Sequence, residues 1–156
     1  MAIGSRALLA VTAALFAGCA TGAWEGTERD PAAVGFAEEL EVDLAAMERS
    51  ASGLYHQDVA PGMGAVARST SLVTIHYVTW LSDGTVLDSS IGGDPFVFRL
   101  GGSEVIRGWN QGIPGMKVGG RRKFVVRPGL AYGSRGTASV PPNATLVFDV
   151  QLVDVR

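Results

Sequence analysis

Two long stretches of alternating apolar and polar residues constrain the fold of this chain more than any other feature of its sequence. They occupy residues 72–81 and 145–155, where the side chains of an extended strand point alternately to its two faces. The apolar positions that share a face are Val73, Ile75, Tyr77 and Leu81 in the first stretch, and Leu146, Phe148, Val150 and Leu152 in the second. Most of the 21 glycines follow residue 60 in turn-like settings, which favours short strands and tight loops.

Further strands and a short helix complete the prediction. The additional strands are expected at 54–56, 85–88, 95–100 and 123–127, with a hairpin turn at 82–84. The segment 104–116 is interrupted by Gly108, Gly112 and Pro114, which favours a short helix followed by a loop. Together these elements predict an α+β domain, in which an antiparallel β-sheet wraps around one short α-helix. An apolar pocket would fit between the sheet and the helix.

A second helix is predicted near the amino terminus. Phe36, Leu40, Leu44 and Met47 recur at spacings of four, four and three, so they would share one face of an amphipathic helix over residues 33–49. Packing of this face on the chain's own domain is favoured over a homodimer interface, because the stripe is shorter than a coiled coil needs. An oligomeric scaffold built by this helix is the remaining alternative.

The first residues have the composition of an export signal. Arg6 precedes an apolar stretch, residues 7–17, that is too short for a membrane-spanning helix, and this predicts a signal peptide over residues 1–18. The run that ends at Cys19 resembles a bacterial lipobox, although Phe16 is bulkier than usual at its position. Cys19 is the only cysteine, so lipidation would explain a thiol that has no disulfide partner. An ordinary cleaved signal with a spectator cysteine is the alternative.

The expected product is therefore an exported lipoprotein, held on a membrane surface and facing the periplasm or the cell exterior. Residues 19–52 would comprise the lipidated cysteine, a flexible tether over 20–31 and the amphipathic helix. Residues 53–156 would form the folded domain.

Several kinds of chemistry are disfavoured by the composition. The formal charge of −2 provides no positive field for nucleic acid. His56 and His76 lack companions at metal-ligand spacing, so no metal and no other cofactor is expected. Ser89 and Ser90 lack both a nucleophile-elbow setting and a plausible histidine partner.

Three motifs in fixed order resemble those of the FKBP-type peptidyl-prolyl cis-trans isomerases. They are Val105-Ile106-Arg107-Gly108-Trp109, Ala131-Tyr132-Gly133, and the run from Val140 to Val150. The resemblance covers residues 53–155. It implies the FKBP-like fold, a rotamase activity on X-Pro bonds and affinity for macrolide inhibitors.

The resemblance also implies a set of site residues. Those that match the family's pocket in type are Tyr77, Asp88, Phe96, Val105, Ile106, Trp109, Tyr132 and Phe148. It implies an indole floor at Trp109 and aromatic walls at Tyr77, Phe96 and Phe148. The Ile106 backbone N–H and the Tyr132 hydroxyl would bind substrate carbonyls, and Asp88 would lie at the rim.

Two departures from the family's pattern affect affinity more than the reaction. Leu87 stands where the family usually has Phe. The flap over 136–140 is one residue shorter, with Thr137 in place of a common aromatic residue or His and Val140 in place of a family Ile. The expected function is acceleration of X-Pro rotation in exported proteins, by non-covalent binding of the twisted amide in the aromatic pocket. The alternative is a chaperone or assembly module that binds Pro-containing segments with little turnover.

Overall fold

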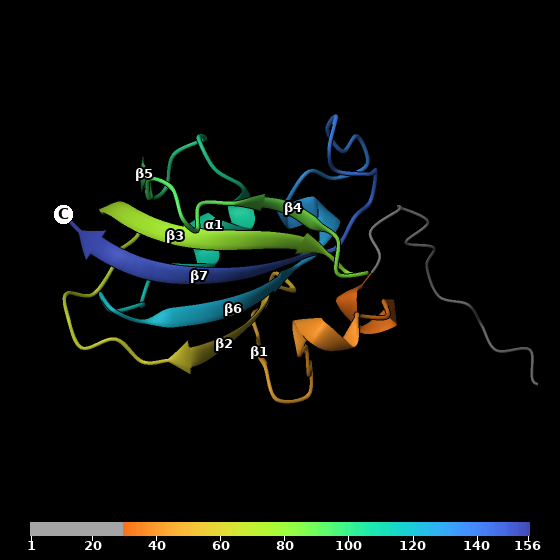
Figure 1. Ribbon diagram of the computed structural model, residues 1–156, viewed down its shortest axis with the longest axis horizontal. Coiled ribbons are helices and arrows are strands. Elements are labelled where there is room, and N and C mark those ends of the chain that lie inside the picture. Colours follow the sequence, from red (N-terminus) through yellow and green to blue (C-terminus); the bar gives the residue numbers. More distant parts are fainter. Residues whose placement is uncertain (1–29) are drawn as a thin grey trace, which may run out of the picture.

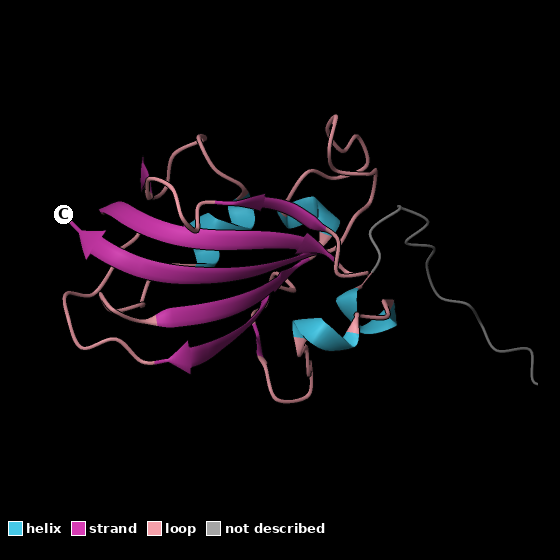
Figure 2. Ribbon diagram, viewed as in Figure 1, coloured by secondary structure: helices cyan, strands magenta, loops and turns pink. Residues whose placement is uncertain are grey.

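The computed structural model describes residues 30–156, which form an antiparallel β-sheet that curves around a short helix (Figures 1 and 2). The strands are β1 (Glu48–Arg49), β2 (Tyr55–Ala60), β3 (Leu72–Leu81), β4 (Val86–Ser89), β5 (Phe96–Arg99), β6 (Arg121–Val126) and β7 (Leu146–Val155). Their order across the sheet is β1-β2-β6-β7-β3-β4, and β5 also pairs with β3. The predicted α+β class, with an antiparallel sheet and one short helix, is confirmed.

Strands β3 and β7 form the centre of the sheet. They pair along nearly their full length, from Val73 opposite Val155 to Leu81 opposite Leu146. The other edge of β3 is shared by two short strands, because β5 pairs with its first half and β4 with its second half. The inward-facing residues of β7 are fully or almost fully buried, as the alternation predicted.

Helix α1 (Arg107–Gly112) lies against the inner face of the sheet. Gly108 and Gly112 are one helical turn apart, and the side chains of Val126 and Phe124 on β6 occupy the space beside them. A Cβ atom at either glycine would come within 3.0 Å of those side chains. The glycines that weaken the helix in isolation therefore permit its close packing on the sheet.

The predicted amphipathic helix over residues 33–49 is wrong. This segment contains two 3₁₀ turns, η1 (Pro31–Ala33) and η2 (Glu38–Leu40), and then continues without helix to β1. Glu41 has a left-handed backbone (φ 49°), which ends the second turn. The backbone N–H of Ala37 donates to the carbonyl of Ser82 in the β3–β4 hairpin instead of to a helical partner. We call residues 30–50 the N-terminal strap.

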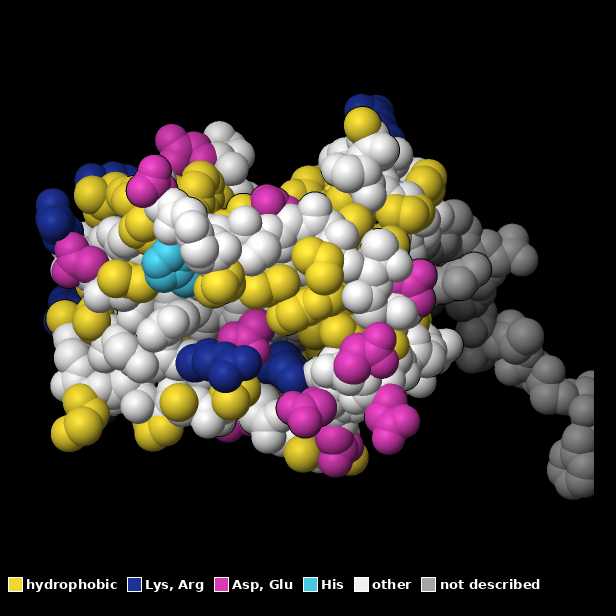
Figure 3. Space-filling view, viewed as in Figure 1, with side chains coloured by type: hydrophobic (Ala, Val, Ile, Leu, Met, Phe, Trp, Pro, Cys, Tyr) yellow, Lys and Arg dark blue, Asp and Glu magenta, His cyan; other side chains and the backbone are white. Residues whose placement is uncertain are grey.

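The N-terminal strap packs on the outer face of the sheet, so the expected packing on the chain's own domain is confirmed. Leu40 and Met47 form a second buried cluster with Tyr55, Val125 and Val147. The Lys123 ammonium group donates to the carbonyl oxygen of Leu40 at 2.6 Å, which satisfies a backbone acceptor that a helix would have used. Figure 3 looks onto this face, where acidic side chains gather over the N-terminal strap at the lower right.

Charged side chains of β6 are also fixed on the body of the protein. Arg121 makes a bidentate pair with the buried carboxylate of Asp149, at 2.6 and 2.7 Å. The buried Arg122 pairs with Asp58 through two hydrogen bonds and donates a third, of 2.8 Å, to the carbonyl oxygen of Gly112. Arg122 thereby links β2, β6 and the carboxyl end of α1.

The signal peptide, Cys19 and almost all of the tether lie outside the described residues, so these predictions are unchanged. Within residues 30–156, no helix has the length and apolar character that a membrane crossing requires.

Candidate active site

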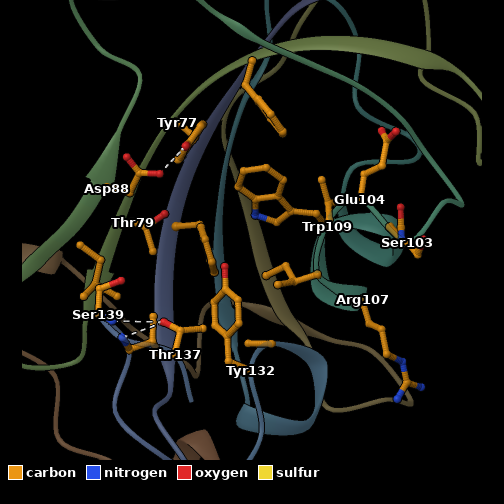
Figure 4. A pocket seen from close by; sticks show the side chains of 18 of the residues that line it. Tyr77, Thr79, Asp88, Ser103, Glu104, Arg107, Trp109, Tyr132, Thr137 and Ser139 are labelled. Carbon is orange, nitrogen blue, oxygen red and sulfur yellow. Dashed lines mark hydrogen bonds between the residues drawn. The ribbon is translucent and has the colours of Figure 1, made fainter. Parts of the chain in front are cut away.

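A cavity of about 710 Å³ opens between α1, the inner face of the sheet and the loop that follows η3 (Pro128–Leu130) (Figure 4). Every pocket residue predicted from the sequence lines it. These residues are Tyr77, Leu87, Asp88, Phe96, Val105, Ile106, Trp109, Tyr132, Val140 and Phe148. The sheet contributes one wall and α1 the opposite wall, so residues far apart in sequence meet around one hollow.

Trp109 lies at the base of the cavity and is only 5% exposed. Its ring meets Tyr77 edge-on at a centroid distance of 5.0 Å and Phe148 edge-on at 5.5 Å. Phe98 packs against the indole at 5.6 Å and continues into a stack with Phe96. These contacts fix the indole plane, because aromatic pairs prefer such edge and offset arrangements.

Tyr77 and Asp88 form a hydrogen-bonded pair across β3 and β4. The Tyr77 hydroxyl donates to Oδ2 of Asp88 at 2.5 Å, and the backbone N–H of Ser89 donates to Oδ1 at 2.8 Å. Burial, and then the adjacent carboxylate, raise the pKa of Tyr77 from 10.0 to about 12. Both oxygens of Asp88 are engaged, so the carboxylate orients Tyr77 and is poorly placed to act as a general base.

An irregularity in the β3–β4 pairing aims Leu87 into the cavity. Thr79 pairs with Asp88 and Trp80 pairs with Val86, so Leu87 is an extra residue on β4. A β-bulge of this kind turns the side chain of the inserted residue, and it frequently occurs beside binding sites. Leu87 is therefore part of the wall although its strand has only four residues.

The groups expected to bind carbonyls lie on the other side of the cavity. Tyr132 is 43% exposed, and its hydroxyl has no hydrogen-bond partner among residues 30–156. Ile106 is the N-cap of α1, so its backbone N–H precedes the hydrogen-bonded turns and is not used by the helix. Both groups can serve a ligand without breaking an existing bond.

The short flap over residues 136–140 is closed by its own hydrogen bonds. The Thr137 N–H donates to the carbonyl of Val140 at 2.8 Å, and the Thr137 hydroxyl accepts from the Val140 N–H at 3.0 Å. Gly136 supplies the left-handed backbone (φ 63°) that this turn requires. Thr137 therefore rigidifies the flap. Val140 lines the cavity and is only 6% exposed.

Sequence reasoning missed several residues that line the cavity. They are Thr79, Gly102, Ser103, Glu104, Arg107, Asn110, Ala131, Thr137 and Ser139. Thr79 could have been found, because the alternation of β3 places it on the same face as Tyr77. The others lie outside the strands, and no periodic signal indicates where their side chains point.

The expectation that Ser90 has no histidine partner is wrong. The Ser90 hydroxyl lies 3.1 Å from Nδ1 of His76 and accepts the backbone N–H of Tyr77 at 2.9 Å. The two residues are brought together by the β3–β4 hairpin, which the sequence separation conceals. Ser90 therefore fixes the backbone at Tyr77. None of the described carboxylates hydrogen-bonds the His76 imidazole, as a catalytic triad would require.

Comparison with known proteins identifies the class to which this fold and cavity belong. Residues 64–153 match the family model described as "FKBP-type peptidyl-prolyl cis-trans isomerase". The matched region includes every pocket residue named above. The chain belongs to the FKBP-type peptidyl-prolyl cis-trans isomerase family.

Curated relatives share the domain but are longer. The protein "FK506-binding protein 4" of Dictyostelium discoideum is 48% identical over 103 residues, which cover 65% of this chain and 28% of that protein. A protein of the same name from Rhizopus delemar is 45% identical over 106 residues, covering 67% of this chain and 28% of the relative. The chain thus spans about a quarter of the length of the curated relatives it matches.

Solved structures agree with the fold. FkpA from Escherichia coli gives a TM-score of 0.68 at 40% identity, over 76% of this chain and 55% of that one. AtFKBP13 gives a TM-score of 0.66 at 39% identity, over 70% of this chain and 98% of that one.

Proposed function

We propose that this protein accelerates rotation about X-Pro bonds in exported polypeptides without covalent chemistry. The observation that carries the proposal is the open cavity with Trp109 at its base, where Tyr132 presents a hydroxyl that no described residue uses. A pyrrolidine ring placed on the indole of Trp109 would lie between Tyr77 and Phe148, because the rings of both residues stand edge-on to the indole. Family membership supports the same reaction.

The physics of amide rotation explains how such a cavity suffices. Twisting the X-Pro bond breaks amide resonance, which sets a barrier of about 18–20 kcal/mol. The planar amide is more polar than the twisted one, so water stabilises the ground state more than the transition state. A cavity of aromatic and aliphatic side chains withholds that solvation and binds the twisted form preferentially.

Hydrogen bonds would keep one end of the substrate fixed while the other turns. The Tyr132 hydroxyl and the Ile106 N–H are the donors available for flanking carbonyls. One neutral hydrogen bond contributes about 0.5–1.5 kcal/mol, so no single donor accounts for the whole acceleration. Effects of single substitutions are therefore expected to be partial.

The proposal is tested by measuring cis–trans exchange of a short X-Pro peptide by NMR with the purified protein. Exchange faster than in buffer, reduced by Trp109→Leu, would support the enzyme. Tight peptide binding without acceleration would instead support the alternative, a chaperone or assembly module for Pro-containing segments. A macrolide added in excess should compete with the peptide in either case.

We further propose that the protein is exported and anchored to a membrane surface through lipidated Cys19. The support is the sequence of residues 1–19, in which a basic residue and an apolar stretch precede a single cysteine. Several acyl chains on one residue hold a protein firmly on a membrane, whereas a single chain holds it only marginally.

Expression in a bacterium with a labelled fatty acid tests the anchor. Wild-type protein should carry the label and sediment with membranes, and Cys19→Ser should lose both properties. A Ser5→Ala variant serves as the control, because it leaves the cysteine and the apolar stretch intact. Membrane association that persists in Cys19→Ser would contradict the lipid anchor.

A further inference from the structure

Thr79 places a hydroxyl in the wall of the cavity, where Figure 4 labels the residue. The residue is 6% exposed, and its inward-facing neighbours on β3 are Tyr77 and Leu81. Across the sheet its direct partners are Phe148 on β7 and Asp88 on β4. None of the residues 30–156 makes a hydrogen bond to the Thr79 hydroxyl, and its oxygen is not among the fully enclosed polar atoms that lack a partner, so it is open to the cavity.

Such a hydroxyl is satisfied by solvent while the cavity is open. A ligand that displaces this solvent without offering a hydrogen bond leaves a buried polar group unpaired, which costs free energy. Valine has the same shape as threonine and suits a strand equally well, so packing does not require the oxygen. Asp88, the cross-strand partner of Thr79, directs its side-chain hydrogen bonds to Tyr77 and Ser89 instead.

The position of Thr79 indicates which part of a ligand it would meet. It follows Tyr77 by one inward-facing position on β3, which is about 7 Å along a strand. A proline ring on Trp109 would lie between Tyr77 and Phe148, so Thr79 lies beside the ring rather than beneath it. The group that reaches Thr79 is therefore the side chain of a residue that flanks the proline.

We propose that Thr79 is a specificity-determining residue, which hydrogen-bonds a short hydroxyl or amide side chain next to the bound proline. This inference rests on the proposed function, because it assumes that a Pro-containing polypeptide occupies the cavity. It goes further by stating the substrate class: polypeptides with Ser, Thr or Asn flanking proline. Leu87, which the β-bulge turns into the same wall, provides the apolar surface beside that hydrogen bond.

A double-mutant cycle tests the proposal with isosteric changes on both sides. Two pairs of peptides are used: Thr-Pro with Val-Pro, which differ before the proline, and Pro-Thr with Pro-Val, which differ after it. Each peptide is titrated by calorimetry into wild-type protein and into Thr79→Val. Wild-type protein should favour the Thr peptide of at least one pair, and Thr79→Val should lower that preference about three- to tenfold. Thr79→Ser, which keeps a hydroxyl, should restore the preference.

The control variant is Thr74→Val, on the outer face of the same strand opposite Val97 and Asp154. It should leave the ratio of affinities unchanged. Suppose that both peptide pairs bind, but that the ratio of the affinity for the Thr peptide to the affinity for the Val peptide is the same in wild-type protein and in Thr79→Val. The role of Thr79 is then overturned and the proposed function stands. If none of the four peptides binds, both are overturned, so the two failures are distinguishable.

Discussion

Gly112 on α1 lies directly against the ring of Phe124 on β6, with no space for a side chain between them. A Cβ atom at Gly112 would lie within 3.0 Å of the Phe124 ring, and Phe124 is completely buried. Arg122 strengthens the same junction by donating to the Gly112 carbonyl oxygen at 2.8 Å. This contact determines how closely the helix, and with it Trp109, approaches the sheet.

Gly112→Ala should therefore destabilise the protein, although alanine favours helix. Overpacking a core typically costs about 1–3 kcal/mol. Chemical denaturation measures the change, with Gly35→Ala as the control, because a Cβ at Gly35 meets no atom within 4 Å. Equal stability of the two variants would contradict the close packing described here.

Tyr77→Phe should change how stability depends on high pH. The fold raises the pKa of Tyr77 to about 12 from 10.0, chiefly by burial and then by the hydrogen bond to Asp88. The neutral phenol thus contributes stability fully below pH 10.0, and this contribution is lost as the pH rises through about 12. Urea unfolding over this range should show a shallower decline in the variant than in wild-type protein. A parallel decline would indicate that Tyr77 does not titrate as the structure implies.

Tyr132→Phe should reduce isomerisation without affecting stability. The hydroxyl is exposed and unused within residues 30–156, so the fold loses nothing when it is removed. Loss of one substrate hydrogen bond corresponds to a roughly two- to tenfold decrease in kcat/KM. NMR exchange spectroscopy measures the rate and thermal unfolding measures the stability. An unchanged rate would remove Tyr132 from the proposed carbonyl-binding groups.

Leu40→Ala tests the N-terminal strap. Leu40 is 4% exposed and packs on the outer face of the sheet with Val125 and Val147. Truncating a buried leucine costs about 2–5 kcal/mol. The cavity lies on the opposite face, so the folded variant should retain wild-type turnover. Glu38→Ala, at an exposed position of the same strap, provides the comparison and should leave the denaturation midpoint unchanged.

Asp58→Asn should destabilise the protein at neutral pH and flatten its acid dependence. Hydrogen bonds from Arg122 lower the pKa of Asp58 below 3.8. The ionised carboxylate therefore contributes stability above pH 3.8, which is lost as the pH falls through the lowered pKa. The Asp58 side chain is 53% exposed, so the expected cost is about 1–2 kcal/mol, less than for a fully buried pair. Urea titrations at several acidic pH values measure both effects.

Alternation predicted β3 and β7 because each has one largely buried face, and the family motifs predicted which of their side chains reach the cavity. The same logic failed for residues 33–49. Helical spacing of Phe36, Leu40, Leu44 and Met47 indicates only that these side chains gather on one side, and an irregular strap achieves this as well as a helix does. The deciding contacts, from Lys123 and Ser82, come from distant parts of the chain and carry no local signal.

Details of the site depended on pairing that the sequence does not display. The β-bulge at Leu87 follows from the register of β4 on β3, and the Ser90–His76 contact follows from the same hairpin. Only the structure reveals that the Thr137 hydroxyl closes the flap. Thr79 was visible in the alternation, but only the structure shows that no residue among 30–156 hydrogen-bonds its hydroxyl.

The position of β7 has a consequence for biosynthesis. It is the last described strand in chain order, yet it lies between β3 and β6 and faces the N-terminal strap through Val147. A nascent chain that lacks residues 146–155 consequently has two half-sheets with open edges, and its strap can contact only the β2 and β6 side of its packing surface. The sheet can be completed only after nearly the whole domain has left the ribosome, and the strand edges beside the position of β7 stay open to aggregation until then.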